Sequence, residues 1–297
     1  MFELRRLRLL YEFSTRGTLA AVAEALAYSP STVSQQLAVL EREAGVPLME
    51  ADGRRVRLTP AGHTLARHAK QMLDLDEQVR SSLSHGSPHP TTVRLAAIHT
   101  SVHPLVTSAL TVLARNRPDI RVNVTVEPPE PALFELSVRA YDMVIAEQYE
   151  GVTRPHDASL DRVAIGRDPL RLGVPLTDTA ASLADVRDRP WVMEPPGTAS
   201  RQWATQQCRA AGFEPDVRFE VADPQIHVQL IADHHAVGLL PGIVGAGRDL
   251  PVRLVDLEGS PHRELFTATR TSTSARDALQ ALRAALAEAF AGLGGSE

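Results

Sequence analysis

The spacing of apolar residues changes near residue 90. Before that point they recur at the period of an α-helix, as in Leu4, Leu7, Leu10 and Phe13. From Val93 onward, short apolar runs typical of strands alternate with helical stretches. The pattern predicts a helical N-terminal part followed by an α/β part. Two or more domains also suit a chain of 297 residues, because single domains typically hold about 100 to 150 residues.

The first 60 residues carry the start and stop signals of three helices and a hairpin. Helical periodicity runs over 4–16, 18–26 and 30–44, with Gly17 and Gly45 as stops. Ser29-Pro30 is a helix start, since serine caps the first turn and proline fits the first helical position. Extended pieces at 48–50 and 55–58 flank Asp52-Gly53, a two-residue hairpin signal. This order predicts three helices and a wing.

A long helix is predicted to follow Gly62 and to end near Ser84. Its apolar positions form one narrow stripe at heptad-like intervals: Leu65, Met72, Leu75, Val79 and Leu83. A helix with such a stripe packs on its own domain or pairs with a second copy of itself. The turn-rich segment 85–92 then predicts a linker.

The remaining residues predict a two-lobed α/β domain. Strand patterns at 93–98, 120–127 and 142–147 enclose helical patterns at 105–116 and 132–139, and this βαβαβ order implies a parallel sheet covered by helices. A second set of strands and helices begins near Asp168. We therefore expect lobe I to comprise about 91–164 and 266–293 and lobe II about 165–265, with a cleft between them.

The predicted helix-turn-helix has an outer face suited to double-stranded DNA. With Val33, Leu37 and Leu40 turned inward, the second helix of this motif, residues 30–44, presents short polar side chains that can bond base edges or phosphates. The wing adds guanidinium groups for phosphates or a minor groove. The first 70 residues have a net charge of +3, against −8 for the remainder. The candidate DNA-binding residues are Ser29, Ser31, Thr32, Ser34, Gln35, Gln36, Arg54, Arg55 and Arg57. The alternative is a small helical bundle with an ordinary polar surface.

The stretch LAAVAEALAYSPSTVSQQLAVLEREAGVPLMEADGRRVRLTPAG, residues 19–62, resembles the DNA-binding domain of LysR-type transcriptional regulators. The resemblance implies a winged helix-turn-helix domain over 1–60, a linker and dimerisation helix with a hinge over 61–90, and an effector domain over 91–297 similar to periplasmic binding proteins. It also implies a homodimer, commonly a homotetramer, that binds promoters and a small-molecule effector, and that contacts RNA polymerase if it activates transcription.

Two segments depart from the family pattern. Pro30-Ser31 stands where Gln-Pro is commoner, and Met49 and Ala51 stand where Phe and Arg are usual. The family's usual Gln contact is therefore absent, and one phosphate contact is lost with the Arg. We expect Ser31 or Gln35 to carry more of the base reading here.

The same resemblance points to two loops as the effector site. They supply His99, Thr100 and Ser101 in lobe I and Thr198, Ser200 and Arg201 in lobe II, and Glu147 follows at the end of a strand. Hydroxyls and backbone N–H groups at helix N-termini favour an anion, so we expect a small acidic metabolite. The alternative is that Thr100 and Ser200 only cap helices, and that His234-His235 is a surface pair outside the cleft.

Other classes of function find little support. A single cysteine, Cys208, excludes an internal disulfide, and no His, Cys or carboxylate spacing completes a recognisable metal site. No nucleophile turn or nucleotide-binding glycine motif appears, so we expect neither an enzyme nor a cofactor. An enzyme fused to a DNA-binding head remains an alternative, which turnover of a bound ligand would support.

A solute-binding protein of the periplasmic type is the other alternative. Two lobes favour it, whereas the first 62 residues oppose it. The opening residues MFELRRLRLLYEF scatter charges among apolar positions and do not resemble a signal peptide. No apolar run approaches the roughly 18 to 20 residues of a membrane span. We expect a cytoplasmic protein without membrane association.

Overall fold

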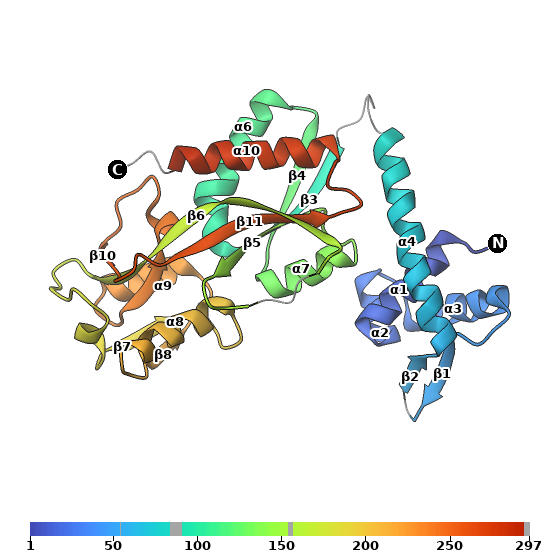
Figure 1. Ribbon diagram of the computed structural model, residues 1–297, viewed down its shortest axis with the longest axis horizontal. Helices are drawn as coiled ribbons and strands as arrows, with labels where there is room; N and C mark the ends of the chain where they lie inside the picture. The colour runs from blue at the N-terminus through green and yellow to red at the C-terminus, as the bar shows by residue number, and fades with distance from the viewer. Residues whose placement is uncertain (54, 84–90, 154–156, 294–297) are drawn as a thin grey trace. The chain divides into compact units, whose positions relative to one another are not determined.

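The computed structural model describes residues 1–53, 55–83, 91–153 and 157–293 (Figure 1). The chain divides into two compact units, 1–87 and 88–297. Among the residues described, no helix is both long and apolar enough to cross a membrane.

The first unit is the predicted helix-turn-helix with its wing and long helix. Its elements are α1 (Leu4–Arg16), α2 (Leu19–Ala25), α3 (Pro30–Ala44), β1 (Met49–Asp52), β2 (Arg55–Leu58) and α4 (Pro60–Leu83). The predicted caps form: the hydroxyl of Thr18 accepts from the N–H of Ala21, and that of Ser29 from the N–H of Thr32, each over 3.1 Å. Gly17 and Gly45 end α1 and α3 at φ of 77° and 70°, where glycine avoids the strain of a side chain.

Two polar side chains, Glu41 and Thr59, fix the wing to the helices. The carboxylate of Glu41 on α3 accepts from the backbone N–H groups of Leu48 and Met49, over 2.7 and 2.9 Å. The hydroxyl of Thr59 donates to the carbonyl of Pro47 over 2.8 Å and accepts from the N–H of Gly62 over 3.0 Å. These bonds set where β1 begins and where α4 starts.

The second unit alternates strands and helices as predicted. Its elements are β3 (Thr91–Ala97), α5 (His99–Ser101), η1 (Val102–Val106), α6 (Thr107–Asn116), β4 (Ile120–Val126), α7 (Pro129–Ser137), β5 (Met143–Tyr149), β6 (Leu160–Pro175), η2 (Ala184–Val186), β7 (Pro190–Met193), α8 (Ala199–Ala210), β8 (Asp216–Glu220), α9 (Pro224–Ala232), β9 (Gly238–Pro241), η3 (Gly242–Gly245), β10 (Val252–Asp256), β11 (His262–Arg270) and α10 (Asp277–Leu293).

The large sheet of this unit is mixed, whereas the sequence suggested a parallel one. Its order is β10-β6-β11-β5-β3-β4, and β9 also pairs with β6. The βαβαβ part is parallel as expected, since β3 pairs in parallel with both β4 and β5. β11 runs antiparallel between β5 and β6. The difference arises because β6 already begins at Leu160, before the point near Asp168 where the second set of strands was expected, and continues to Pro175.

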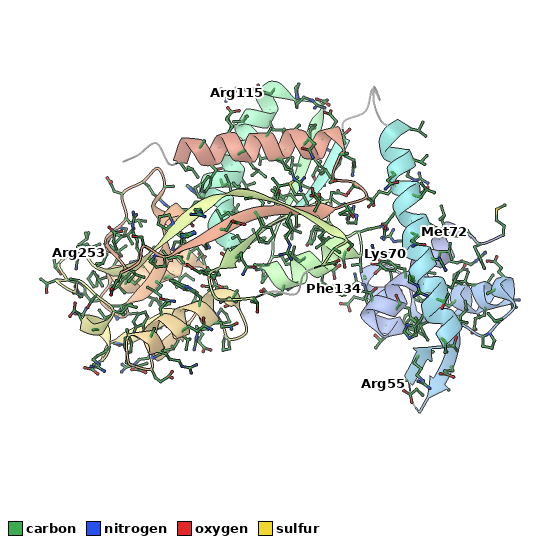
Figure 2. All side chains as sticks on the ribbon, in the orientation of Figure 1. Arg55, Lys70, Met72, Arg115, Phe134 and Arg253 are labelled. Carbon is green, nitrogen blue, oxygen red and sulfur yellow. The ribbon has the colours of Figure 1, made fainter. Side chains whose placement is uncertain are left out.

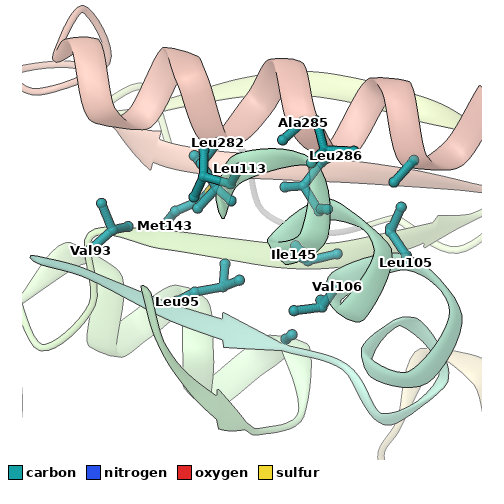
Figure 3. Close-up of a cluster of buried hydrophobic side chains, with 14 of the residues drawn as sticks. Val93, Leu95, Leu105, Val106, Leu113, Met143, Ile145, Leu282, Ala285 and Leu286 are labelled. Atoms are coloured by element: carbon teal, nitrogen blue, oxygen red, sulfur yellow. The ribbon is translucent and has the colours of Figure 1, made fainter. Parts of the chain in front are cut away.

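Separate apolar cores lie on the two parts of this unit. In the first, α6 and α10 cover one face of β3 and β5, with Leu113, Leu282 and Leu286 packed against Met143 and Ile145 (Figure 3). α7 covers the opposite face. In the second, α8 and α9 pack on β7 and on the later residues of β6. This two-lobed α/β arrangement is the predicted fold class, and β6 is common to both lobes.

Candidate functional site

Helix α3 presents a polar face above a buried apolar one. Val33, Leu37 and Leu40 are buried, while Ser31, Ser34 and Gln35 are exposed and Thr32 is half-buried. Three of the predicted base-reading side chains therefore lie on one exposed face of α3, where a ligand can reach them.

Two other predicted DNA-binding residues already have partners within the unit. The hydroxyl of Ser29 caps α3 and lies 2.8 Å from the hydroxyls of Ser31 and Thr32. Gln36 is half-buried, and its Oε1 accepts from Nε of Arg6 on α1 over 3.2 Å. The geometry favours a structural role for Ser29 and Gln36, while Ser34 and Gln35 are exposed beside them on α3.

The wing presents arginine side chains beyond the core. Arg55 and Arg57 are exposed (Arg55 is labelled in Figure 2), and Arg57 pairs with Glu50 across the hairpin over 2.9 Å. Arg54 lies outside the described residues. Met49 is half-buried and Ala51 is exposed, so the position that lacks the family's Arg is on the surface.

Helix α4 has two apolar faces. Ala66, Ala69 and Leu73 are buried in the contact with α1. A second set keeps large exposed fractions: Met72 at 44% (Figure 2), Leu75 at 60%, Val79 at 48% and Leu83 at 77%. Four large apolar side chains at helical spacing on one surface are typical of a helix that pairs with another.

The second unit contains a cavity of about 170 Å³ at the carboxyl ends of its parallel strands. The lining residues follow β3, β4, β7 and β8 or lie near the end of β5, which is where α/β domains usually bind ligands. The cavity is lined by Ile98, His99, Thr100, Glu127, Pro128, Pro129, Glu130, Glu147, Glu194, Pro195, Thr198, Ala199 and Ala222.

Four of the seven predicted effector-binding residues line this cavity: His99, Thr100, Glu147 and Thr198. Thr198 is also the N-cap of α8, since its hydroxyl accepts from the N–H of Arg201 over 3.2 Å. The side chain of Thr198 therefore both caps α8 and forms part of the cavity wall.

The other three predicted effector-binding residues lie outside the lining. Ser101 is buried and donates to the carbonyl of Ile98 over 2.9 Å, so it serves the helix start. Arg201 donates to the carbonyl of Glu194 over 3.0 Å and lies 3.3 Å from the carboxylate of Glu220. The hydroxyl of Ser200 hydrogen-bonds to Glu194 and to Tyr149.

A buried arginine that the sequence did not single out lies behind the cavity. Arg263 on β11 is 1% exposed. Its Nε donates to Asp168 over 2.9 Å, its Nη2 donates to the hydroxyl of Thr100 over 2.9 Å, and its Nη1 contacts Glu147. Asp168 in turn accepts from the N–H of Ile243 over 2.9 Å. The network joins α5, β5, β6, β11 and η3.

Carboxyl groups dominate the charge of the cavity wall. Glu127, Glu130, Glu147 and Glu194 line it, and His99 is the one residue among the lining set that could carry a positive charge. Burial, with the negative charge of Glu147 as the second cause, raises the pKa of Glu194 to about 7. An anion in this cavity would meet several carboxyl groups, so the lining alone does not support the expected acidic ligand, which stays a prediction.

The remaining candidates lie elsewhere. His234 and His235 are exposed and line a separate cavity with Asp178 and Arg189, in agreement with a surface pair. Cys208 is buried, and burial raises the pKa of its thiol to about 12, so little reactive thiolate exists at neutral pH. Across the described ranges, no three His, Cys, Asp or Glu residues gather as a metal site.

Comparison with known proteins assigns both units. Residues 4–63 match the bacterial regulatory helix-turn-helix protein model of the lysR family, and residues 86–291 match the LysR substrate binding domain. The malonate utilization transcriptional regulator of Klebsiella pneumoniae is 26% identical over 284 residues, which cover 92% of this chain and 91% of that protein. The transcriptional regulator GbpR of Azospirillum brasilense is 27% identical over 245 residues, 79% of this chain and 70% of that protein.

Solved structures share the fold. Full-length OxyR from Pseudomonas aeruginosa superposes with a TM-score of 0.69 at 18% identity and covers 96% of this chain and 95% of its own. Full-length BenM gives a TM-score of 0.58 at 19% identity, with 100% and 99% covered. The relatives matched by sequence are transcriptional regulators and not enzymes. The chain belongs to the LysR family of DNA-binding transcriptional regulators, with a substrate-binding effector domain.

Proposed function

We propose that this regulator reads its operator through the exposed face of α3 and responds to a small molecule bound in the cavity of its second unit. In this proposal Ser31, Thr32, Ser34 and Gln35 contact base edges and phosphates in the major groove, and Arg55 and Arg57 contact the backbone. The observation that carries the proposal is the polar outer face of α3 on a buried apolar one, within a capped helix-turn-helix.

The exposed stripe on α4 supports a further proposal, that the protein forms a homodimer through this helix. Met72, Leu75, Val79 and Leu83 would become buried between two copies. Two copies would present two α3 helices to two half-sites related by a twofold axis. A tetramer would bind two such sites, and the protein would act in the cytoplasm, with RNA polymerase as a partner where it activates transcription.

Coupling between the two functions follows from the position of the cavity. Its wall is built from both lobes of the second unit, so a ligand that fits one arrangement of the lobes better than another shifts the population toward that arrangement. The ligand thereby changes the affinity for DNA or for polymerase, which is allostery in the strict sense.

Selection of genomic DNA fragments by the purified full-length protein tests the proposal. The binding buffer should have near-physiological salt, because phosphate contacts make affinity depend on salt concentration. We expect enrichment of a few sites with twofold-related halves, and a marked loss of this enrichment for Gln35→Ala. Equal recovery of all fragments, with and without extract of small molecules, would contradict operator recognition.

Thr100→Val and Thr198→Val test the effector part. Both remove a hydroxyl from the cavity wall while keeping the side-chain shape. We expect unchanged affinity for DNA in the absence of effector and a reduced response when extract is added. A normal response from both variants would contradict this position for the effector.

A further inference from the structure

The cavity of the second unit has a wall whose charge suits one class of ligand. Its polar lining is mostly carboxyl groups, from Glu127 after β4, Glu147 on β5 and Glu194 after β7. These residues come from both lobes and face the same space. The ligand of this cavity must therefore accommodate negative charge on two sides.

The nearest buried cation is already engaged. Each nitrogen of the Arg263 guanidinium has a partner: Nε donates to Asp168, Nη1 contacts Glu147, and Nη2 donates to Thr100. The hydroxyl of Tyr149 makes a further hydrogen bond with the same group. A carboxylate ligand would have to displace one of these partners before it could bind Arg263 bidentately.

The carboxyl groups differ in how well they are compensated. Glu127 accepts from the hydroxyl of Tyr141 over 2.6 Å, and Glu147 is paired with Arg263. Glu194 accepts hydrogen bonds from the hydroxyls of Thr198 and Ser200, and the nearby charge of Arg263 only partly offsets the cost of its burial. An uncompensated carboxylate in a poorly hydrated site is unfavourable, and a cation beside it removes the cost.

We infer that the cavity selects an effector that carries a protonated amine or another cationic nitrogen, held between Glu194 and Glu147. The inference rests on the proposed function, since it takes this cavity to be the effector site. The carbon chain of the ligand would lie against Ile98, Pro128, Pro129 and Pro195. A volume of about 170 Å³ is below the roughly 300 to 1,000 Å³ of typical drug-sized sites, so the ligand has only a few carbon atoms.

A matched set of small molecules tests the charge preference. Ligand-observed NMR on the full-length protein would compare diamines, amino acids with a terminal amine, dicarboxylates and diols on the same straight chains of about three to six carbon atoms. We expect binding signals from the amines and not from the dicarboxylates. Glu194→Gln should weaken amine binding at least about tenfold, the equivalent of about 1.4 kcal/mol. Glu288→Gln, on the exposed surface of α10, is the matched control and should leave amine binding unchanged.

A blocking variant separates failure of this inference from failure of the proposed function. Ala222 is exposed and lines the cavity, so Ala222→Trp should fill the space without burying a new group in the core. Far-UV circular dichroism and the unfolding midpoint check that it folds, and Ala222→Leu is a milder replacement.

Three results would overturn the inference. Dicarboxylates that bind in a manner sensitive to Ala222→Trp would contradict the amine preference but keep the effector site. Amines that bind Glu194→Gln as tightly as the unchanged protein would contradict the assigned contact. If Ala222→Trp changes the binding of none of these ligand classes, both the ligand class and the position of the effector site are contradicted.

Discussion

Nη2 of Arg263 on β11 donates to the hydroxyl Oγ1 of Thr100, which follows β3, over 2.9 Å. The two residues are 163 positions apart in the chain, and the bond makes the wall of the cavity part of a buried ionic network. The pKa of Arg263 is raised: burial alone would lower it, but Glu147 and Asp168 outweigh that effect. The charge of the arginine is therefore permanent, and its removal affects every partner.

Arg263→Met should destabilise the second unit strongly. The substitution leaves Glu147 and Asp168 buried without their cation, and breaking such a pair typically costs about 3 to 5 kcal/mol. Urea unfolding of the full-length protein measures the change. Arg171→Met is the matched control: Arg171 pairs with Asp256, which is 82% exposed, and surface pairs contribute at most about 1 kcal/mol. Equal effects of the two substitutions would contradict the importance of the buried network.

Glu194 should make stability depend on pH. Its pKa is raised to about 7 in the folded protein, above the ordinary value of 4.5. Between these pH values the folded protein binds a proton that the unfolded chain has released, so the free energy of unfolding falls as pH rises from about 4.5 to 7. Glu194→Gln removes this loss and should be stabilising by up to about 3 kcal/mol at pH 8, with no gain near pH 4.5.

Urea midpoints of Glu194→Gln and the unchanged protein at pH 5, 6, 7 and 8 measure this difference. Glu288→Gln again serves as the control, with an expected difference that does not vary over this range. A constant difference for Glu194→Gln would show that the carboxyl group is already ionised at pH 5.

Ser31→Ala and Gln35→Ala should weaken specific DNA binding and leave the fold intact. Both side chains are exposed on α3, and a good base contact contributes about 1 to 3 kcal/mol of discrimination. Fluorescence anisotropy with a selected operator and with random DNA separates specific from general affinity. Gln202→Ala, exposed on α8, should change neither. Unchanged operator affinity in both α3 variants would exclude this face as the reading surface.

Leu75→Glu and Val79→Glu should disrupt the dimer more than the monomer fold. Both side chains are about half exposed or more within one chain, but they would be buried between two α4 helices, where an unpaired carboxylate is costly. Sedimentation velocity should show a smaller species, while helicity is retained. Gln78→Glu adds the same charge at an exposed position next to the stripe and should leave the assembly unchanged.

Gly62→Ala should destabilise the junction between the wing and α4. A Cβ at Gly62 would collide with the backbone carbonyl of Leu48, and backbone atoms cannot move aside as a flexible side chain can. We expect a loss of about 1 to 3 kcal/mol, the range of overpacking, with weaker DNA binding. Gly292→Ala on α10 is the control, because a Cβ there meets nothing within 4 Å; it should be neutral or stabilising by up to about 1 kcal/mol.

The first unit could be predicted from sequence because its signals are local. Thr18, Ser29 and Pro30 start helices, and Gly17 and Gly45 end them, each within one turn of the element it controls. Gln36 was harder to place, because its partner Arg6 lies 30 residues away on another helix. A polar residue next to the exposed face of α3 can therefore bind another helix of the same unit and not DNA.

The cavity was predictable in position but not in charge. The resemblance to the LysR family pointed to the loops that hold His99, Thr100 and Thr198, whereas the carboxyl groups of Glu127 and Glu194 converge only through the tertiary fold. Arg263 comes shortly after Pro261, which marks a turn, and just before the expected boundary between lobe II and lobe I at 265–266. The sequence pattern also does not distinguish a buried arginine at the start of a strand from an exposed one, because strand ends are commonly charged and exposed to solvent.

The β6 strand has a mechanical consequence for any signal that crosses the second unit. Its residues from Leu160 to Pro169 pair with β11, and those from Leu170 to Pro175 pair with β9 and β10. One continuous strand therefore joins the two lobes, so the backbone of β6 restricts how far they can separate, whereas a strand tolerates changes in twist. If the cavity binds the effector as we propose, its occupancy would reach the rest of the unit as a small torsion of β6, and the stiffness of this strand would limit the size of that torsion.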